Sequence, residues 1–177
     1  DPMRHLPRSM RDHWMGEYVT RFRNVVPDDP YRYALYRIMG RFDVTKKFPT
    51  PLVLSTENWL WLQLCLISEA PAGDSHAPAL QSYTLQDLAN KLEKYGEAHF
   101  DPKGHRPLHY FQLLLLVGRF ENAVAFLCSR PAYQVDAVHF AIALTYYGLL
   151  RVSSAAQAPS LDLISVSNHV SYIDLAK

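Results

Sequence analysis

Glycine, cysteine and long apolar runs are all scarce in this sequence, and each shortage excludes a class of protein. Seven glycines in 177 residues argue against a turn-rich β-sandwich and against a glycine-rich phosphate-binding loop. Two cysteines, both within apolar stretches, argue against a disulfide scaffold and favour a reducing compartment, the cytosol or the nucleus. The longest unbroken apolar run, at residues 113–118, is far shorter than the ~20 residues that cross a bilayer. We therefore expect no membrane-spanning segment in this chain.

An excess of charge of one sign is also missing. The formal net charge is +1, although residues 1–50 carry ten Lys and Arg against six Asp and Glu. The arginines of that segment stand singly within amphipathic patterns, which is typical of a solvated helix face rather than of a nucleic-acid or lipid site. With 49% hydrophobic and 20% charged residues, the chain is expected to bury a core of its own.

Helical periodicity runs through most of the chain. Apolar residues recur at spacings of three and four, and prolines, glycines and polar loops separate the periodic segments. These signals predict seven helices, over about residues 7–23, 30–42, 56–69, 84–96, 107–118, 121–128 and 135–149. Short connections between them predict an all-α fold, an antiparallel helical stack that forms part of an α-solenoid.

Three of these helices carry apolar stripes that are expected to face the core. The stripes are Met10, Trp14, Tyr18 and Phe22 in the first helix, Tyr31, Leu35, Ile38 and Phe42 in the second, and Val135, Val138, Ile142, Tyr146 and Leu149 in the seventh. Tyr33 and Tyr36 fall outside the second stripe and are interpreted as packing against a neighbouring layer or a partner peptide. The third helix is apolar around nearly its whole circumference, which predicts packing on several sides.

Side chains that can cap helices mark several boundaries. Asp29 and Ser55 are placed to accept first-turn amide hydrogen bonds. Thr84 and Asp87 resemble a capping box, and Gly96 is placed to end that helix in a left-handed turn. These positions set the expected starts of three helices and the end of one.

The chain is expected to form one solenoid segment over residues 1–150, with no separate second domain. Residues 70–82 are predicted to be a flexible surface loop, because small and polar residues dominate there. Residues 151–177 are interpreted as a flexible connection followed by a further helix of the same solenoid, at about residues 161–175. Residues 114–127 resemble one helix–turn–helix unit of an α-solenoid, although no repeat of fixed length is visible.

Eight histidines prompt a search for a metal site, and the best cluster is Glu97, His99, His105 and His109. Pro107 places His105 outside the helix that carries His109, and no His-Glu-x-x-His or Cys-x-x-Cys motif accompanies them. The cluster is therefore interpreted as loop and surface histidines, and no metal or cofactor is predicted.

Catalytic chemistry is disfavoured on similar grounds. A nucleophilic pair of Cys128 and His139 would need a polar setting, whereas Cys128 lies among apolar residues and is interpreted as packed and inert. Asp28 and Asp29 do not form an acid–base pair, because Asp29 is placed as a helix cap. No catalytic residue is predicted, and the chain is not expected to be an enzyme.

Several distinctive stretches follow one another in order along the chain. They include Asp29-Pro-Tyr at the start of the second helix and Ile38-Met-Gly-Arg-Phe-Asp-Val44 at its end, with further stretches at residues 5–14, 57–64, 83–100, 107–127 and 136–144. Through these stretches the sequence resembles the Nic-type (nucleoporin-interacting component) scaffold nucleoporins of the inner ring of the nuclear pore. The resemblance covers most of residues 5–150.

The resemblance implies a structural scaffold component of the nuclear pore complex, located at the nuclear envelope and supporting nucleocytoplasmic transport. Its implied partners are other inner-ring and linker nucleoporins, bound through protein–protein contacts on a face that the sequence does not identify. It implies no direct contact with nucleic acid, no small-molecule substrate, and membrane association only through the pore.

Two other interpretations compete with the scaffold. A generic helical-repeat adaptor that binds peptides is suggested by the hairpin at residues 114–127, but it predicts a regular 34-residue repeat that the sequence lacks. A metal-dependent hydrolase rests only on the histidine cluster at residues 97–109.

Overall fold

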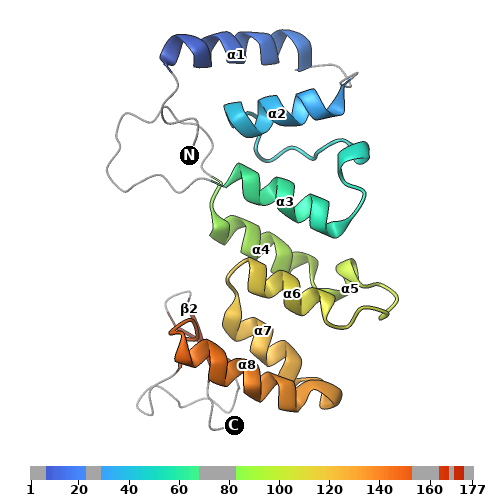
Figure 1. Ribbon diagram of the computed structural model, residues 1–177, viewed down its shortest axis with the longest axis vertical. Coiled ribbons are helices and arrows are strands. Elements are labelled where there is room, and N and C mark those ends of the chain that lie inside the picture. Colours follow the sequence, from blue (N-terminus) through green and yellow to red (C-terminus); the bar gives the residue numbers. More distant parts are fainter. Residues whose placement is uncertain (1–6, 23–28, 68–82, 153–163, 168–169, 174–177) are drawn as a thin grey trace. The chain divides into compact units, whose positions relative to one another are not determined.

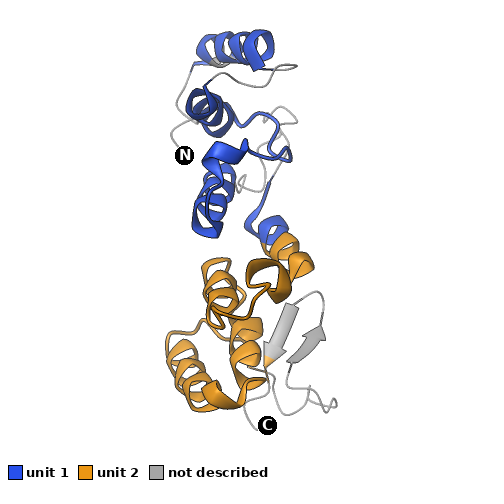
Figure 2. Ribbon diagram, turned by 90° about the vertical axis from the view of Figure 1, so that its right-hand side faces the viewer, with its two compact units in different colours: residues 1–88 blue, residues 89–177 orange. Residues whose placement is uncertain are grey.

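The computed structural model describes residues 7–22, 29–67, 83–152, 164–167 and 170–173 (Figure 1). These residues form eight α-helices, two short 3-10 helices and a two-stranded antiparallel sheet. The chain divides into two compact units, residues 1–88 and residues 89–177 (Figure 2). The predicted flexible loop at residues 70–82 lies outside the described residues, as does most of the predicted connection after residue 151.

The first unit is built from three helices and a short 3-10 turn. In chain order these are α1 Arg8–Phe22, α2 Pro30–Gly40, η1 Thr50–Leu52 and α3 Thr56–Leu66. Both predicted caps are confirmed. Asp29 accepts hydrogen bonds from the backbone N–H groups of Tyr31 and Arg32, each at 3.0 Å, and Ser55 accepts one from Asn58 at 3.2 Å.

An aromatic core joins α1 to α2. Its buried members are Tyr18, Tyr33 and Phe42, and Phe22 and Tyr36 pack around them. The ring centroids of Tyr18 and Phe42 lie 4.8 Å apart. Tyr33 and Tyr36 therefore pack against a neighbouring layer, the first of the two interpretations given above.

The stripe predicted for α2 is wrong at two of its four positions. Tyr31 and Leu35 are exposed, whereas the residues that α2 buries are Tyr33, Ala34, Arg37 and Gly40. The helix is turned away from the expected face because the tyrosine rings meet α1 and the Arg37 side chain reaches interior carbonyl groups. In α1 the predicted stripe is buried at Tyr18, while Met10 at its start is exposed.

The third helix is not covered on every side. Leu60, Leu62, Gln63 and Leu66 are buried, but the indole of Trp61 is 61% exposed. The sequence predicts that α3 is packed on several sides, because apolar residues surround it. Within the described residues, other parts of the chain cover only some of these sides.

The second unit continues the helical series. Its elements are α4 Leu85–Tyr95, which starts at the end of the first unit, then α5 Glu97–Phe100, α6 His109–Leu116, α7 Phe120–Cys128, η2 Pro131–Tyr133 and α8 Gln134–Tyr146. The predicted capping box is confirmed, because Asp87 accepts from the backbone N–H of Thr84 at 2.9 Å and donates its own N–H to the Thr84 hydroxyl at 3.2 Å. Gly96 ends the helix with a positive φ of 69°, as expected, but its ψ of 174° differs from that of the predicted left-handed turn.

Successive helices of this unit pack on one another, α6 on α7 and α7 on α8. One core cluster consists of Val124, Ala141, Leu150 and Ile173, with Phe120, Cys128 and Leu144 packed around it. Gly118, at φ 74°, supplies the left-handed turn that joins α6 to α7 as the predicted hairpin requires. The stripe expected to bury α8 is wrong: its five residues, Val135, Val138, Ile142, Tyr146 and Leu149, are all exposed.

The helix predicted near the end of the chain is also wrong. Two strands, β1 Ile164–Ser167 and β2 Val170–Ile173, pair antiparallel with Ile164 opposite Ile173. The cause can be read in the sequence, since apolar and small polar residues alternate at Ile-Ser-Val-Ser and Val-Ser-Tyr, a period of two that favours strands. The Ile173 side chain is buried, and its N–H donates to the carbonyl of Arg151 at 2.9 Å.

The all-α fold class is confirmed, with this short hairpin as the exception. Within the described part of the chain, no helix combines the length and the apolar character needed to cross a membrane.

Candidate interaction surfaces and a buried arginine cluster

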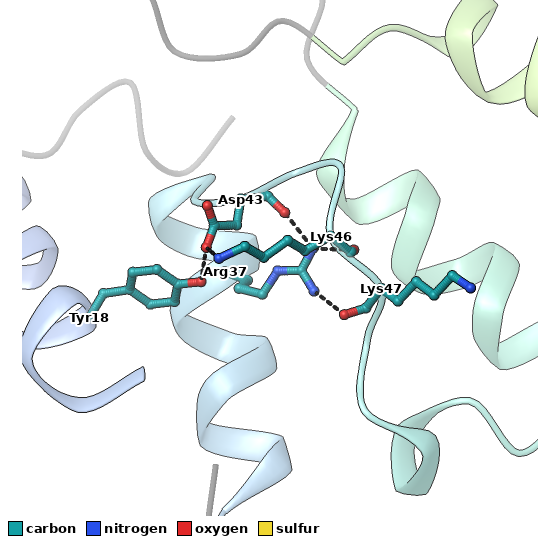
Figure 3. A network of polar contacts seen from close by, with 5 residues as sticks. All are labelled: Tyr18, Arg37, Asp43, Lys46 and Lys47. Carbon is teal, nitrogen blue, oxygen red and sulfur yellow. Dashed lines mark hydrogen bonds and ion pairs between the residues drawn. The ribbon is translucent and has the colours of Figure 1, made fainter. Parts of the chain in front are cut away.

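Among the described residues of the first unit, Arg37 is the most deeply buried charged residue, with none of its surface exposed. Its guanidinium donates hydrogen bonds to three backbone carbonyl oxygens, those of Asp43 at 2.7 Å, Lys46 at 2.8 Å and Lys47 at 3.2 Å (Figure 3). The ring of Phe48 lies 4.0 Å from the guanidinium carbon and covers one face of the group. One side chain of α2 thus fixes the connection that leads to η1.

The carboxylate of Asp43 ties the same connection to α1. The hydroxyl of Tyr18 donates to Asp43 Oδ2 at 2.8 Å, and Lys46 Nζ approaches the same oxygen at 2.5 Å (Figure 3). We call Tyr18, Arg37, Asp43, Lys46 and Lys47 the arginine cluster. Its contacts join α1, α2 and the following loop, which indicates a structural role.

The segment Ile38-Met-Gly-Arg-Phe-Asp-Val44 owes its composition to this cluster. A Cβ atom on Gly40 would lie 2.1 Å from the buried ring of Phe42, so a larger residue does not fit there without movement. Arg41 and Asp43 both have positive φ, at 55° and 48°. Arg41 also donates to the carbonyl oxygen of Leu66 at the end of α3, at 3.0 Å.

Protonation equilibria follow from these contacts. Burial lowers the pKa of the Arg37 guanidinium, which nevertheless stays charged at neutral pH. Burial, followed by hydrogen bonds to Tyr33 and Asp43, raises the pKa of Tyr18. Burial alone would raise the pKa of Asp43, but the hydrogen bonds from Lys46 and Tyr18 outweigh it and lower that pKa below its ordinary value.

The lowered pKa of Asp43 predicts a contribution to stability that acid removes. The contribution is fully present above the unfolded-state pKa of about 3.9 and disappears as the pH falls through the lower folded-state pKa. We expect the Asp43→Asn variant to lose less stability than the unaltered chain between pH 5 and pH 3, by up to about 1 kcal/mol. Asparagine tolerates positive φ, so the backbone is not strained by the exchange.

The measurement is urea unfolding followed by tryptophan fluorescence, which reports the first unit because all three tryptophans lie in residues 1–88. Other carboxylates titrate in the same pH range. The contribution of Asp43 is therefore obtained from the difference in unfolding free energy between the variant and the unaltered chain at each pH. Parallel stability curves for the two proteins from pH 6 to pH 3 would contradict the prediction.

In the second unit, polar side chains of α7 and of the residues that flank it hold α4 and α5. Arg119 Nε forms an ion pair with Glu93 Oε1 at 3.0 Å, and its Nη2 donates to Asn90 at 2.8 Å. Asn122 donates to the same Glu93 carboxylate at 2.8 Å, and Arg130 pairs with Glu97 at the start of α5. Ion pairs and hydrogen bonds therefore help to hold α4 and α5 next to α7.

Glu121, in the first turn of α7, is a buried carboxylate that sequence reasoning missed. It is 3% exposed, and its Oε1 accepts a hydrogen bond from the backbone N–H of Arg151 at 2.9 Å. The contact anchors the chain just before Val152, which bridges to Ile173 of β2. The Gly-Arg-Phe-Glu-x-Ala segment at residues 118–123 thus has a structural function at almost every position.

The histidine cluster considered for metal binding is dispersed. Glu97 is occupied by its ion pair with Arg130, His99 stacks on the ring of a neighbouring tyrosine, His105 is exposed, and His109 is buried in α6. Among the residues that the structure describes, no group of three or more His, Cys, Asp or Glu is placed to hold a metal ion.

Cys128, which the sequence predicts to be packed and inert, is half-buried beside the core cluster of Val124, Ala141, Leu150 and Ile173, and burial raises the pKa of its thiol. A raised pKa disfavours the thiolate that nucleophilic chemistry requires. His139 is exposed on α8. Asp29 serves as the cap of α2, as predicted, and Asp28 lies outside the described residues.

Exposed apolar side chains are the remaining candidates for function. In the first unit they include Tyr31 and Leu35 on α2, Leu54 before α3, and Trp61 on α3. In the second unit they concentrate on α8 and the residues just after it. Large exposed apolar side chains of this kind are typical of surfaces that another protein layer covers.

Comparison with known proteins gives one consistent family. The sequence model of the Nup93/Nic96 family matches residues 1–177. The chain is 42% identical over 163 residues to nucleoporin NIC96 of Chaetomium thermophilum, covering 88% of this chain and 14% of that protein. It is 38% identical over 160 residues to the meiotically up-regulated gene 87 protein of Schizosaccharomyces pombe, covering 90% of this chain and 18% of that protein.

Structural comparison agrees. The crystal structure of Chaetomium thermophilum Nic96 SOL matches with a TM-score of 0.77 and 37% sequence identity, over 98% of this chain and 25% of that one. The vertebrate relative Nup93 of Xenopus tropicalis is 37% identical over 138 residues, covering 76% of this chain and 16% of that protein. The chain thus spans less than a fifth of the length of these three related proteins and a quarter of the solved Nic96 chain.

Proposed function

Because this chain belongs to the Nup93/Nic96 family of nucleoporins, we propose that it is a structural scaffold segment of the nuclear pore complex. The observation that carries the proposal is the family match along the whole chain, supported by the similarity of fold to a solved Nic96. The side chains described above serve the same role, because the buried polar groups bind the protein's own backbone and neighbouring helices.

We further propose that the segment lies in the inner ring and acts through contacts with other inner-ring and linker nucleoporins. Its helices would hold neighbouring proteins in place and so support nucleocytoplasmic transport, with contact to the membrane only through the pore. The proposal assigns no catalysis, cofactor, small-molecule substrate or direct nucleic-acid contact to the segment. The adaptor alternative is less favoured, because no 34-residue repeat accompanies the hairpin at residues 114–127.

The test is to tag the protein at its own gene, image it, and crosslink it in cells with an amine-reactive reagent. We expect fluorescence at the nuclear rim and crosslinks from exposed lysines such as Lys47, Lys94 and Lys103 to nucleoporins. The tag expressed alone serves as the control for background. Diffuse cytoplasmic fluorescence with crosslinks to cytosolic proteins would contradict the scaffold proposal and favour the adaptor.

A further inference from the structure

The loop between α2 and α3 (Figure 1) holds the only position in the 177 residues where a serine or threonine directly precedes proline, Thr50-Pro51. Both residues are exposed. The hydroxyls of Thr20, Thr84 and Ser129 are bound to neighbouring groups. The hydroxyl of Thr50, by contrast, has no partner among the residues that the structure describes. The loop therefore presents an unoccupied hydroxyl, followed by proline, at the surface.

The backbone around Thr50 is held by few interactions. Thr50 is the first residue of η1, a single 3-10 turn in which no residue is buried. Two backbone hydrogen bonds of 3.0 Å close the turn, one from Leu52 to the carbonyl of Pro49 and one from Val53 to the carbonyl of Thr50. A short exposed turn of this kind opens at a small cost in free energy. An enzyme can therefore extend this stretch of chain in its cleft.

The residues just before the turn are anchored, and they fix where the opening would stop. The Arg37 guanidinium binds backbone carbonyl groups as far as Lys47, and the buried ring of Phe48 packs against it. Residues 49–54 follow this anchor, and none of them is buried. Opening of residues 49–54 would thus leave the arginine cluster in place.

Proline after a hydroxyl residue is a recognition element because it has no backbone N–H. A cleft that offers no hydrogen-bond acceptor at that position would leave the N–H of any other residue unpaired, so it favours proline. Pro51 meets this condition. The other exposed threonine of the loop, Thr45, is followed by Lys46 and does not. The sequence at Thr50 therefore fits the proline-directed class of protein kinases.

We propose that Thr50 is a phosphorylation site for a proline-directed protein kinase, with ATP as the phosphoryl donor. The Thr50 hydroxyl oxygen attacks the γ-phosphorus of ATP, and an O–P bond forms. The bond from that phosphorus to the bridging oxygen of ADP breaks, and the hydroxyl proton passes to a base of the kinase. The products are phosphothreonine and ADP. The inference concerns this loop and is independent of location at the pore.

The phosphate would invert the charge of the loop. The charged residues between positions 43 and 54 are Asp43, Lys46 and Lys47, so the net charge there is +1. A phosphate on Thr50 adds about −1.5 to −2 at neutral pH. The exposed ammonium of Lys47 has no partner among the described residues and is available to pair with it. A protein that covers Leu54, which is 78% exposed, would then meet a negative loop instead of a positive one.

The test is phosphorylation of the purified polypeptide that the natural gene produces, with ATP and a cyclin-dependent kinase as the proline-directed probe. Mass spectrometry of the peptides locates and quantifies the phosphate. Pro51→Ala keeps the hydroxyl but removes the recognition element, and Thr50→Val keeps the shape of the side chain but removes the hydroxyl. Thr45→Ala, at an exposed threonine of the same loop, is the matched control. A synthetic peptide of residues 44–56 gives the rate for an unfolded substrate.

We expect the folded polypeptide to be phosphorylated at Thr50 within roughly tenfold of the rate of the peptide. Pro51→Ala should slow the reaction roughly tenfold or more, Thr50→Val should abolish it, and Thr45→Ala should leave it unchanged. The same residue should carry phosphate in protein isolated from cells with phosphatase inhibitors. A folded chain that reacts more than roughly a hundredfold more slowly than the peptide would overturn the proposal, because the fold would shield the hydroxyl. Cellular protein without phosphate on Thr50, or equal rates for Pro51→Ala and the unaltered chain, would also overturn it.

Discussion

The Arg37→Ala variant is expected to lose about 3–5 kcal/mol of unfolding free energy in the first unit. The substitution removes a fully buried guanidinium and leaves the carbonyl groups of Asp43, Lys46 and Lys47 without their donor. Each hydrogen bond from a charged donor contributes about 1.5–3 kcal/mol, and the space vacated beside Phe48 adds a packing loss. Urea unfolding followed by tryptophan fluorescence measures the change.

Arg32→Ala is the matched control for this substitution. Arg32 is on the same helix and is exposed, so its loss should change the unfolding free energy far less than the loss of Arg37. Arg37→Lys separates charge from geometry, because a lysine ammonium retains the charge but does not present the planar fork that reaches three carbonyl groups. If Arg37→Ala and Arg32→Ala had similar effects, Arg37 would not be the residue that fixes the loop.

The Leu127→Ala variant is expected to destabilise the second unit by about 3 kcal/mol, within the usual range for a buried leucine. Leu127 is 1% exposed on α7, the helix that packs on both α6 and α8. Truncation leaves a cavity in the middle of this packing, and the surrounding helices relax only partly. Far-ultraviolet circular dichroism during urea unfolding is the appropriate measurement, since this unit has no tryptophan.

Leu116→Ala supplies the matched control, because the same atoms are removed from a leucine that is 59% exposed on α6. We expect a change within about 0.5 kcal/mol there. A cost at Leu116 as large as at Leu127 would show that α6 is covered on the side that the structure leaves open. A negligible cost at both sites would place the stabilising contacts of this unit elsewhere.

Helix positions follow from the sequence because they depend on short-range interactions. The caps at Asp29, Ser55 and Thr84 and the positive φ at Gly96 all involve residues within a few positions of one another. The strands β1 and β2 could also be predicted locally, because apolar and polar residues alternate there with period two. Each strand has only four residues, so this alternation is a weak signal. The family resemblance also came from the sequence, since it rests on ordered motifs rather than on contacts.

The direction in which each helix faces depended on the tertiary structure. Tyr33 and Arg37 lie one turn apart on α2 and share its buried face. Because arginine is rarely buried, the sequence pattern favours the apolar stripe as the buried face instead. The buried carboxylate of Glu121 accepts a hydrogen bond from the backbone N–H of Arg151, which lies thirty positions later in the chain. No local pattern contains that information.

The sequence by itself thus determined that the chain is helical, where most helices begin and end, and to which family it belongs. Only the tertiary structure decided that the Arg37 side chain organises the first unit and that α8 buries Ala137 and Ala141 while Val135, Ile142 and Tyr146 are exposed. The physical reason is that hydrogen bonds and caps within a helix are local. Burial is a relation between distant segments, and a helix that is apolar on every side carries no periodic signal to show which side meets a neighbour.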